Sequence, residues 1–204
     1  MDVLRFDRWD FLGTKVLLML VAVVTPLVTV VLPVVTWLTG GALVWEGEVG
    51  SPAALQQPDV VALGGADLRW PGTATVSLPD ADTAVWLASL LPGLVVSLTT
   101  VTVALLMSWL LRRIQRGDAF VAASVTVLRL VGLTLVVGSL VTRASSAIAD
   151  ASVQSSAVGT NPYVTVTLSL SAPLAFILVG LLVAAVAEAF AHGARLADDV
   201  AGLV

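Results

Sequence analysis

Two charged residues lie within apolar segments of the chain, where a charge needs a partner. Arg129 falls in the apolar stretch from Ala119 to Thr142, and Glu188 directly follows an uncharged run. A charged side chain inside a membrane-spanning helix pairs with an opposite charge or marks a path for ions or protons. We predict an intramembrane polar pair between Arg129 and Glu188 that serves the structure rather than catalysis.

Glu188 and His192 lie four residues apart, a spacing that places both side chains on one face of a helix and can hold a metal ion. A third ligand is missing nearby, because His192 is the single histidine and the chain has no cysteine. The sequence also contains no phosphate-binding glycine loop, no H-E-x-x-H motif and no nucleophile paired with a base. It therefore predicts a non-enzymatic protein with no catalytic residue, no metal and no cofactor.

The most patterned polar stretch runs from Arg112 to Phe120 and reads Arg-Arg-Ile-Gln-Arg-Gly-Asp-Ala-Phe. Its glycine suits the end of one helix and its aspartate the N-cap of the next, so a tight helix–helix turn explains the pattern. In the alternative interpretation, this turn contacts anionic headgroups or a cytosolic partner. The candidate contact residues are Arg112, Arg113, Arg116, Asp118 and Phe120.

The composition indicates which elements must position these residues. Of 204 residues, 58% are hydrophobic and 12% are charged, whereas soluble domains are about 25% charged. The mean hydropathy is +1.00, and the net charge of −4 offers no basic surface for nucleic acid. These values exclude a soluble enzyme, a disordered tail and a protein that binds nucleic acid directly, and they predict a small polytopic membrane protein.

A membrane-spanning helix needs about 20 apolar residues. Uncharged runs of that length are Val16–Leu38, Ala84–Leu111 and a segment within Val164–Ala187. The third span contains Arg129 and has two registers, one from Ala119 and one from about residue 128 to 148 after an amphipathic lead-in. We expect a single four-span domain over residues 1–204, with spans at about 16–38, 84–111, 124–146 and 172–191.

The basic residues set the expected orientation, because short cytoplasmic loops are enriched in lysine and arginine. The N-terminal tail, the loop after the second span and the C-terminal tail together carry seven of them, whereas the other two loops carry only Arg69 and Arg143. We therefore expect a multi-pass protein of the cell membrane with both termini cytoplasmic. The outer loops are then residues 39–83 and 147–171.

Short strand-like runs punctuate both predicted outer loops. Ala42–Trp45 and Thr73–Leu78 lie in the first, and strict apolar/polar alternation runs from Val164 to Ser171 in the second. We predict a small antiparallel sheet built from both loops. Ser171 is the expected N-cap of the last helix, with Pro173 in its first turn.

Two segments carry a resemblance to a known family. The run Leu111–Phe120, followed by Val127-Leu-Arg-Leu-Val-Gly132, resembles the Gly-Asp-x-Phe turn and Leu-Arg-x-x-Gly helix start of a bacterial four-span family, domain of unknown function 2975. The run from Glu188 to Leu196 is similar to that family's closing Glu-x-Phe-x-x-Gly-x-x-Leu pattern. Val121–Ala123 departs from the family, which commonly has polar residues after the phenylalanine. The resemblance implies an inner-membrane protein without an established activity. It also implies that the gene lies beside that of a small helix-turn-helix regulator, as it does for many members of the family.

These observations predict an all-α four-helix bundle with a small extracytoplasmic β element. The function we expect is that of a regulatory or accessory membrane protein, which senses a signal and tethers a cytosolic partner such as a helix-turn-helix transcriptional regulator. The alternative is a transporter, a channel or a subunit of a transport complex, for which a homo-oligomer would supply the polar path. Ala185, Ala189 and Gly193 form a line of small residues that permits close helix packing or dimerisation.

Overall fold

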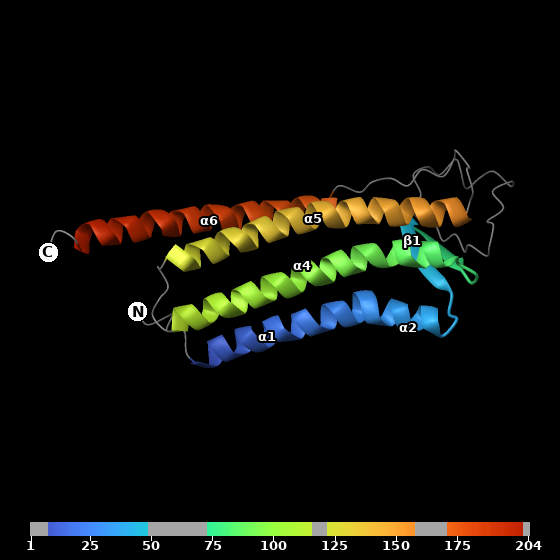
Figure 1. Ribbon diagram of the computed structural model, residues 1–204, viewed down its shortest axis with the longest axis horizontal. Coiled ribbons are helices and arrows are strands. Elements are labelled where there is room, and N and C mark those ends of the chain that lie inside the picture. The colour runs from blue at the N-terminus through green and yellow to red at the C-terminus, as the bar shows by residue number, and fades with distance from the viewer. Residues whose placement is uncertain (1–7, 49–72, 116–121, 158–170, 202–204) are drawn as a thin grey trace. The chain divides into compact units, whose positions relative to one another are not determined.

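The described residues are mostly helical, and the long helical segments follow one another in the order of the predicted spans (Figure 1). A computed structural model describes residues 8–48, 73–115, 122–157 and 171–201. Within these residues, the helical segments long and apolar enough to cross a membrane are Leu12–Leu38, Thr83–Gln115, Ala123–Ser156 and Ala175–Gly193. The prediction of four helices that could span a membrane is therefore confirmed.

The chain forms two compact units. Unit 1 comprises Met1–Thr25, Val96–Leu140 and Ser171–Val204, and unit 2 comprises Pro26–Val95 and Val141–Leu170. Because these boundaries fall inside helices, the second and third long helices each contribute one part to each unit. The single domain expected over residues 1–204 stays a prediction.

The first span is interrupted by a π-helical turn. Helix α1 (Arg8–Pro26) leads into η1 (Leu27–Val31) and then into α2 (Leu32–Leu38). Pro33 has no N–H, so the carbonyl of Thr29 cannot accept the usual bond from four residues on. The ladder shifts accordingly, and the N–H of Leu32 donates to the carbonyl of Leu27, five residues back. The proline thus accounts for a change of register that the apolar run did not predict.

Two glycines end α2. Gly40 has a φ of 74°, its N–H donates to the Trp37 carbonyl at 3.1 Å, and the N–H of Gly41 donates to the Thr36 carbonyl at 2.8 Å. This pair of bonds is a Schellman motif, in which a left-handed residue satisfies the last carbonyls of a helix. It turns the chain directly into the first strand.

The β element is a two-stranded antiparallel sheet of β1 (Leu43–Glu48) and β2 (Thr73–Leu78). Leu43 pairs with Leu78 at one end of the register and Glu48 pairs with Thr73 at the other. Both strands come from the loop between the first two spans, as predicted. The expectation of a sheet built from both loops is only partly met, because residues 158–170, which carry the alternating run, lie outside the described residues.

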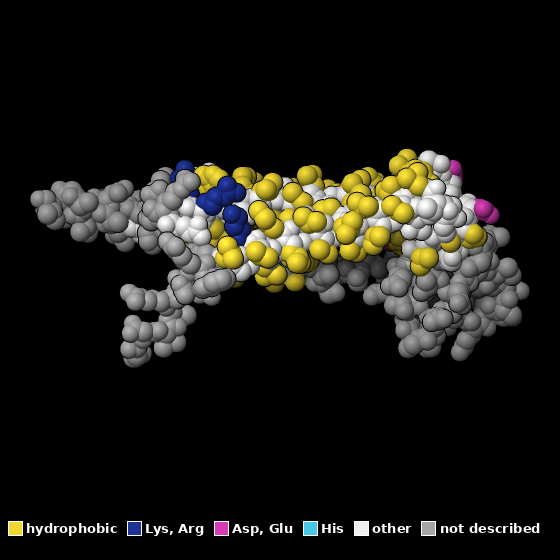
Figure 2. All heavy atoms as spheres, turned by 90° about the horizontal axis from the view of Figure 1, so that it is seen from below, with side chains coloured by type: hydrophobic (Ala, Val, Ile, Leu, Met, Phe, Trp, Pro, Cys, Tyr) yellow, Lys and Arg dark blue, Asp and Glu magenta, His cyan; other side chains and the backbone are white. Residues whose placement is uncertain are grey.

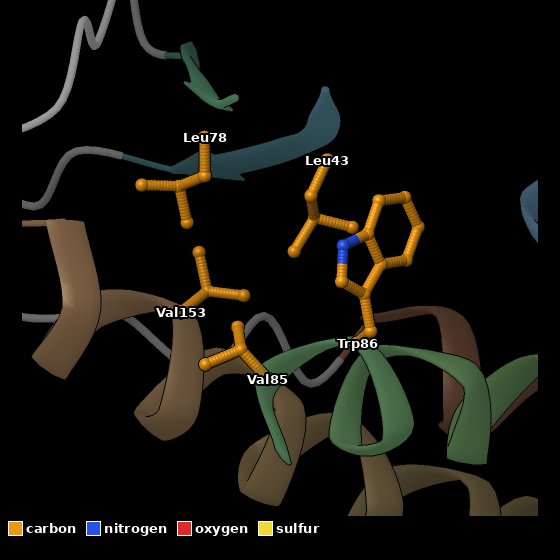
Figure 3. Close-up of a cluster of buried hydrophobic side chains, with 5 residues drawn as sticks. All are labelled: Leu43, Leu78, Val85, Trp86 and Val153. Carbon is orange, nitrogen blue, oxygen red and sulfur yellow. The ribbon is translucent and has the colours of Figure 1, made fainter. Parts of the chain in front are cut away.

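Unit 2 has a hydrophobic core beneath this sheet. Figure 3 shows Leu43 and Leu78 of the sheet pointing towards Val85 and Trp86 of α4 and Val153 of α5. All five side chains are buried. An isolated two-stranded ribbon is marginal in water, and the contacts with the two helices supply the support that it needs.

The three remaining helices are long. Helix α4 covers Thr83–Gln115, α5 covers Ala122–Ala157 and α6 covers Ser171–Ala201. With 36 residues, α5 is about 54 Å long. It includes the register from about residue 128 to 148, whereas Ala119, the start of the other register, lies outside the described residues. It continues beyond residue 146 because the segment from Arg143 to Ala157 contains no glycine or proline and is rich in alanine.

The helices of unit 1 expose large apolar side chains. On the face drawn in Figure 2, hydrophobic side chains cover the helices. Each helix of the unit contributes to this surface, for example Leu17, Leu98, Leu133 and Leu182. In the first span, none of the most apolar window is buried. Such a surface fits a hydrocarbon environment better than water.

Candidate functional site

The candidate site lies in unit 1, and a glycine contact between α5 and α6 sets its geometry. A Cβ atom added to Gly132 would lie 2.8 Å from the Gly180 carbonyl oxygen and 3.3 Å from the Ala184 Cβ atom. In return, a Cβ atom on Gly180 would lie 2.9 Å from the Gly132 carbonyl oxygen. The two backbones are therefore nearly in contact, as small residues permit in membrane helices.

This close contact uses other small residues than the line singled out in the sequence. Ala185, Ala189 and Gly193 are exposed, and no atom lies within 4 Å of a Cβ atom placed on Gly193. The small residues of α6 that pack against α5 are Gly180 and Ala184, which lie four residues apart in the small-xxx-small pattern. The signal that sequence analysis missed is the glycine at position 132, which faces them.

One helical turn beyond this contact, the structure brings Arg129 and Glu188 together. Arg129 lies three residues before Gly132, and Glu188 lies four residues after Ala184. The Arg129 Nη2 atom donates to the Glu188 Oε2 atom at 2.5 Å. The side chains are 54% and 50% exposed, so the pair lies on the surface of the unit. Its two charges neutralise each other beside an apolar surface.

His192 lies one turn further along α6 and faces the same carboxylate. Its Nδ1 atom is 3.7 Å from the Glu188 Oε1 atom and 3.0 Å from the Glu188 backbone oxygen. Among the described residues, no group of three His, Cys, Asp or Glu side chains comes together to hold a metal. The Glu188 carboxylate is engaged by a guanidinium, so this arrangement suits charge pairing better than proton transfer or metal binding.

The two arginines at the end of α4 belong to the same unit. The Arg113 Cζ atom lies 4.2 Å from the centroid of the Trp109 ring, which is a cation–π contact, and Arg112 is exposed. The other members of the predicted contact set, Arg116, Asp118 and Phe120, lie outside the described residues. Figure 2 shows lysine and arginine side chains gathered near this end of the helices.

Unit 2 contains a second polar contact that the sequence analysis did not single out. The indole Nε1–H of Trp45 donates to the Asp150 Oδ1 atom at 3.0 Å and connects β1 to α5. Beside it, Trp37 and Trp86 stack with ring centroids 6.1 Å apart. These three tryptophans line the core of the unit, a role that no spacing in the sequence signals.

Comparisons with known proteins support the resemblance seen in the sequence. The family model described as "Protein of unknown function (DUF2975)" matches residues 54–202. That range includes α4, α5 and α6, with the glycine contact and the Arg129–Glu188 pair. No curated protein and no solved structure matches the chain.

Proposed function

The chain belongs to the DUF2975 family of proteins of unknown function, and from this premise we propose that it is a regulatory or accessory membrane protein without enzymatic activity. It crosses the membrane four times and holds a cytosolic protein partner. The contact surface is formed by the end of α4 and the residues that follow it in the sequence. The observation that carries the proposal is the exposed basic end of α4, formed by Arg112 and the Trp109–Arg113 pair.

In the proposed orientation, the protein lies in a bacterial inner membrane with both termini on the cytoplasmic side. Seven basic residues in the two tails and in the loop after the second span favour it, since positive charges are retained on that side. They are Arg5, Arg8, Lys15, Arg112, Arg113, Arg116 and Arg195. The basic end of α4 then faces the cytosol, where a soluble partner can reach it.

The polar groups described in unit 1 support a role in binding rather than in chemistry. Glu188 is held by Arg129, and the Nδ1 atom of His192 lies at hydrogen-bonding distance from a backbone oxygen. Neither side chain is poised as a free acid or base towards a substrate. By contrast, the Arg112 side chain is exposed, and arginine is enriched at protein interfaces. A small helix-turn-helix regulator, the partner implied by the family resemblance, is one protein that fits this role.

The test is an affinity purification in mild detergent from native membranes, followed by mass spectrometry. We expect a soluble cytosolic protein to co-purify with the wild type and to be lost when Arg112, Arg113 and Arg116 are all changed to Ala. The matched control changes the same three residues to Lys, which keeps the charge that sets the topology. Because the chain has no cysteine, single introduced cysteines can report the side of each loop in both variants.

The outcomes separate the two classes of function. Retention of the partner by the alanine variant would place the binding surface elsewhere and contradict the proposal. Co-purification of an ATPase or of another polytopic protein, with no soluble partner, would favour a subunit of a transport complex. A homo-oligomer alone would also count against a tethered partner, and flux in liposomes would then test for a channel.

A further inference from the structure

One face of α4, within unit 1, changes from apolar to aromatic to basic as the helix approaches its end. Leu98 and Leu105 are 71% and 65% exposed, and Trp109 is 38% exposed. Arg112, the last residue of the series, is exposed as well. The successive spacings of seven, four and three residues keep these side chains on one face of the helix. In a bilayer, leucine suits the hydrocarbon and tryptophan the interface, so this order places the Arg112 guanidinium at the level of the lipid headgroups.

The next arginine is held against the same indole. The Arg113 Cζ atom lies 4.2 Å from the centroid of the Trp109 ring. This cation–π contact uses the flat face of the guanidinium, whereas its N–H donors point outward in the guanidinium plane. The contact therefore orients Arg113 without occupying its donors, and an oxyanion can still bind at the edge of the guanidinium.

The positive charge at this end of α4 has no described counter-charge. Among the unit 1 side chains that the structure describes, the only carboxylate is that of Glu188, and Arg129 binds it. The described residues provide no ion pair for Arg112 or Arg113. On the face drawn in Figure 2, basic side chains adjoin hydrophobic ones. A ligand that matches this surface is anionic at one end and apolar at the other.

We propose that Trp109, Arg112 and Arg113 bind the phosphate of an anionic phospholipid, whose acyl chains lie along Leu105 and Leu98. The two guanidinium groups form charge-assisted hydrogen bonds with the phosphate, and the indole packs beside the headgroup. The exposed leucines favour a lipid over inorganic phosphate as the source of the anion, because an inorganic ion does not cover them. The described part of unit 1 offers no unengaged carboxylate to the ammonium of a zwitterionic headgroup, which favours an anionic lipid.

The lipid site overlaps with the surface proposed for the cytosolic partner. Arg112 and Arg113 belong to both, so a bound lipid competes with the partner. This competition rests on the proposed function, whereas lipid binding needs no partner and is measured on the chain alone. A failure of the lipid site and a failure of the proposed function are therefore separate results.

The test uses the full chain, delipidated in detergent and titrated with phosphatidylglycerol or with phosphatidylcholine of the same acyl chains. Inorganic phosphate is added as a competitor, and native mass spectrometry counts the bound lipid. We expect phosphatidylglycerol to bind most tightly and inorganic phosphate to leave it bound. If a partner co-purifies with the protein, phosphatidylglycerol should release it and phosphatidylcholine should not.

Three variants locate the site. The double variant Arg112→Gln with Arg113→Gln should bind phosphatidylglycerol about 25-fold more weakly, because each cation near a headgroup contributes about fivefold. The double variant Arg112→Lys with Arg113→Lys should lose less, since it keeps the charge and loses only the paired geometry. The control Arg143→Gln removes a positive charge in unit 2 and should bind like the wild type.

Three results would overturn the proposal. The first is equal binding of the two lipids, and the second is unchanged binding of phosphatidylglycerol by the double glutamine variant. The third is displacement of the lipid by inorganic phosphate, which would identify a site for a soluble anion. If the double glutamine variant does not fold, Trp109→Phe decides. Lipids brominated near the headgroup must then quench the fluorescence that this variant lacks, and phosphatidylglycerol must quench it more than phosphatidylcholine does.

Discussion

Breaking the Arg129–Glu188 pair should reveal whether it lies in water or at the membrane. Two unit charges about 4 Å apart attract by about 1 kcal/mol in bulk water and by about 4 kcal/mol at an effective dielectric constant near 20. With the side chains 54% and 50% exposed in the protein, one side of the pair faces the solvent or the lipid. For a pair at the membrane boundary we expect a coupling energy of about 2 kcal/mol, intermediate between these limits.

The assay is a double-mutant cycle on reversible unfolding of the protein in bilayer discs. Arg129→Gln and Glu188→Gln should each destabilise by about 2 kcal/mol, and the double variant should cost little more than either one. The exchanged pair, Arg129→Glu with Glu188→Arg, should recover most of the loss. Arg112→Gln serves as the control for removal of a charge, because Arg112 is exposed.

The size of the coupling energy shows whether water or lipid surrounds the pair. An exposed pair in water is worth about 0–1 kcal/mol and weakens with salt. A coupling energy below about 0.5 kcal/mol in the bilayer, or one abolished by 1 M salt, would refute the placement of the pair at the membrane boundary. Failure of the exchanged pair to recover stability would refute the pairing itself.

Two further predictions concern packing and the sheet. Gly132→Leu should destabilise the protein by roughly 1–3 kcal/mol through overpacking against Gly180. Gly193→Leu is the control and should change the unfolding midpoint little, because no atom lies within 4 Å of a Cβ atom placed on Gly193. Equal effects of the two substitutions on the unfolding midpoint would contradict the close contact. Trp45→Phe should lower the free energy of unfolding by about 1 kcal/mol, because it leaves the Asp150 carboxylate without its donor. In a protein that already carries Asp150→Ala, the same substitution should lower the free energy of unfolding clearly less.

The long helices were predictable because each contains a run of apolar residues that only a helix can place in a bilayer. The strand at Thr73–Leu78 was predictable for a similar local reason, since turn-forming residues bound a β-prone run. The π-turn was not predicted, although Pro33 contains its cause. The position of the π-turn depends on which backbone carbonyl lacks a hydrogen-bond donor. A hydropathy pattern contains no information about that missing hydrogen bond.

The candidate site was likewise predictable only in part. The pairing of Arg129 with Glu188 could be proposed because an unneutralised charge near hydrocarbon is costly and the chain offers few partners. The contact that sets their register, Gly132 against Gly180, depends on which faces of two helices meet. A single sequence in which small residues are common does not encode that choice visibly.

The hydrogen bond between Trp45 and Asp150 has a consequence for how the protein is made. Its two partners are separated by 105 residues, and ribosomes add about 5–20 residues per second. The indole therefore waits roughly 5–20 s for its acceptor to be synthesised. During that interval Leu43 and Leu78 also lack Val153, which follows Asp150 on the same helix. Unit 2 thus closes late in biosynthesis, and a chain truncated before α5 would leave the sheet without half of its support.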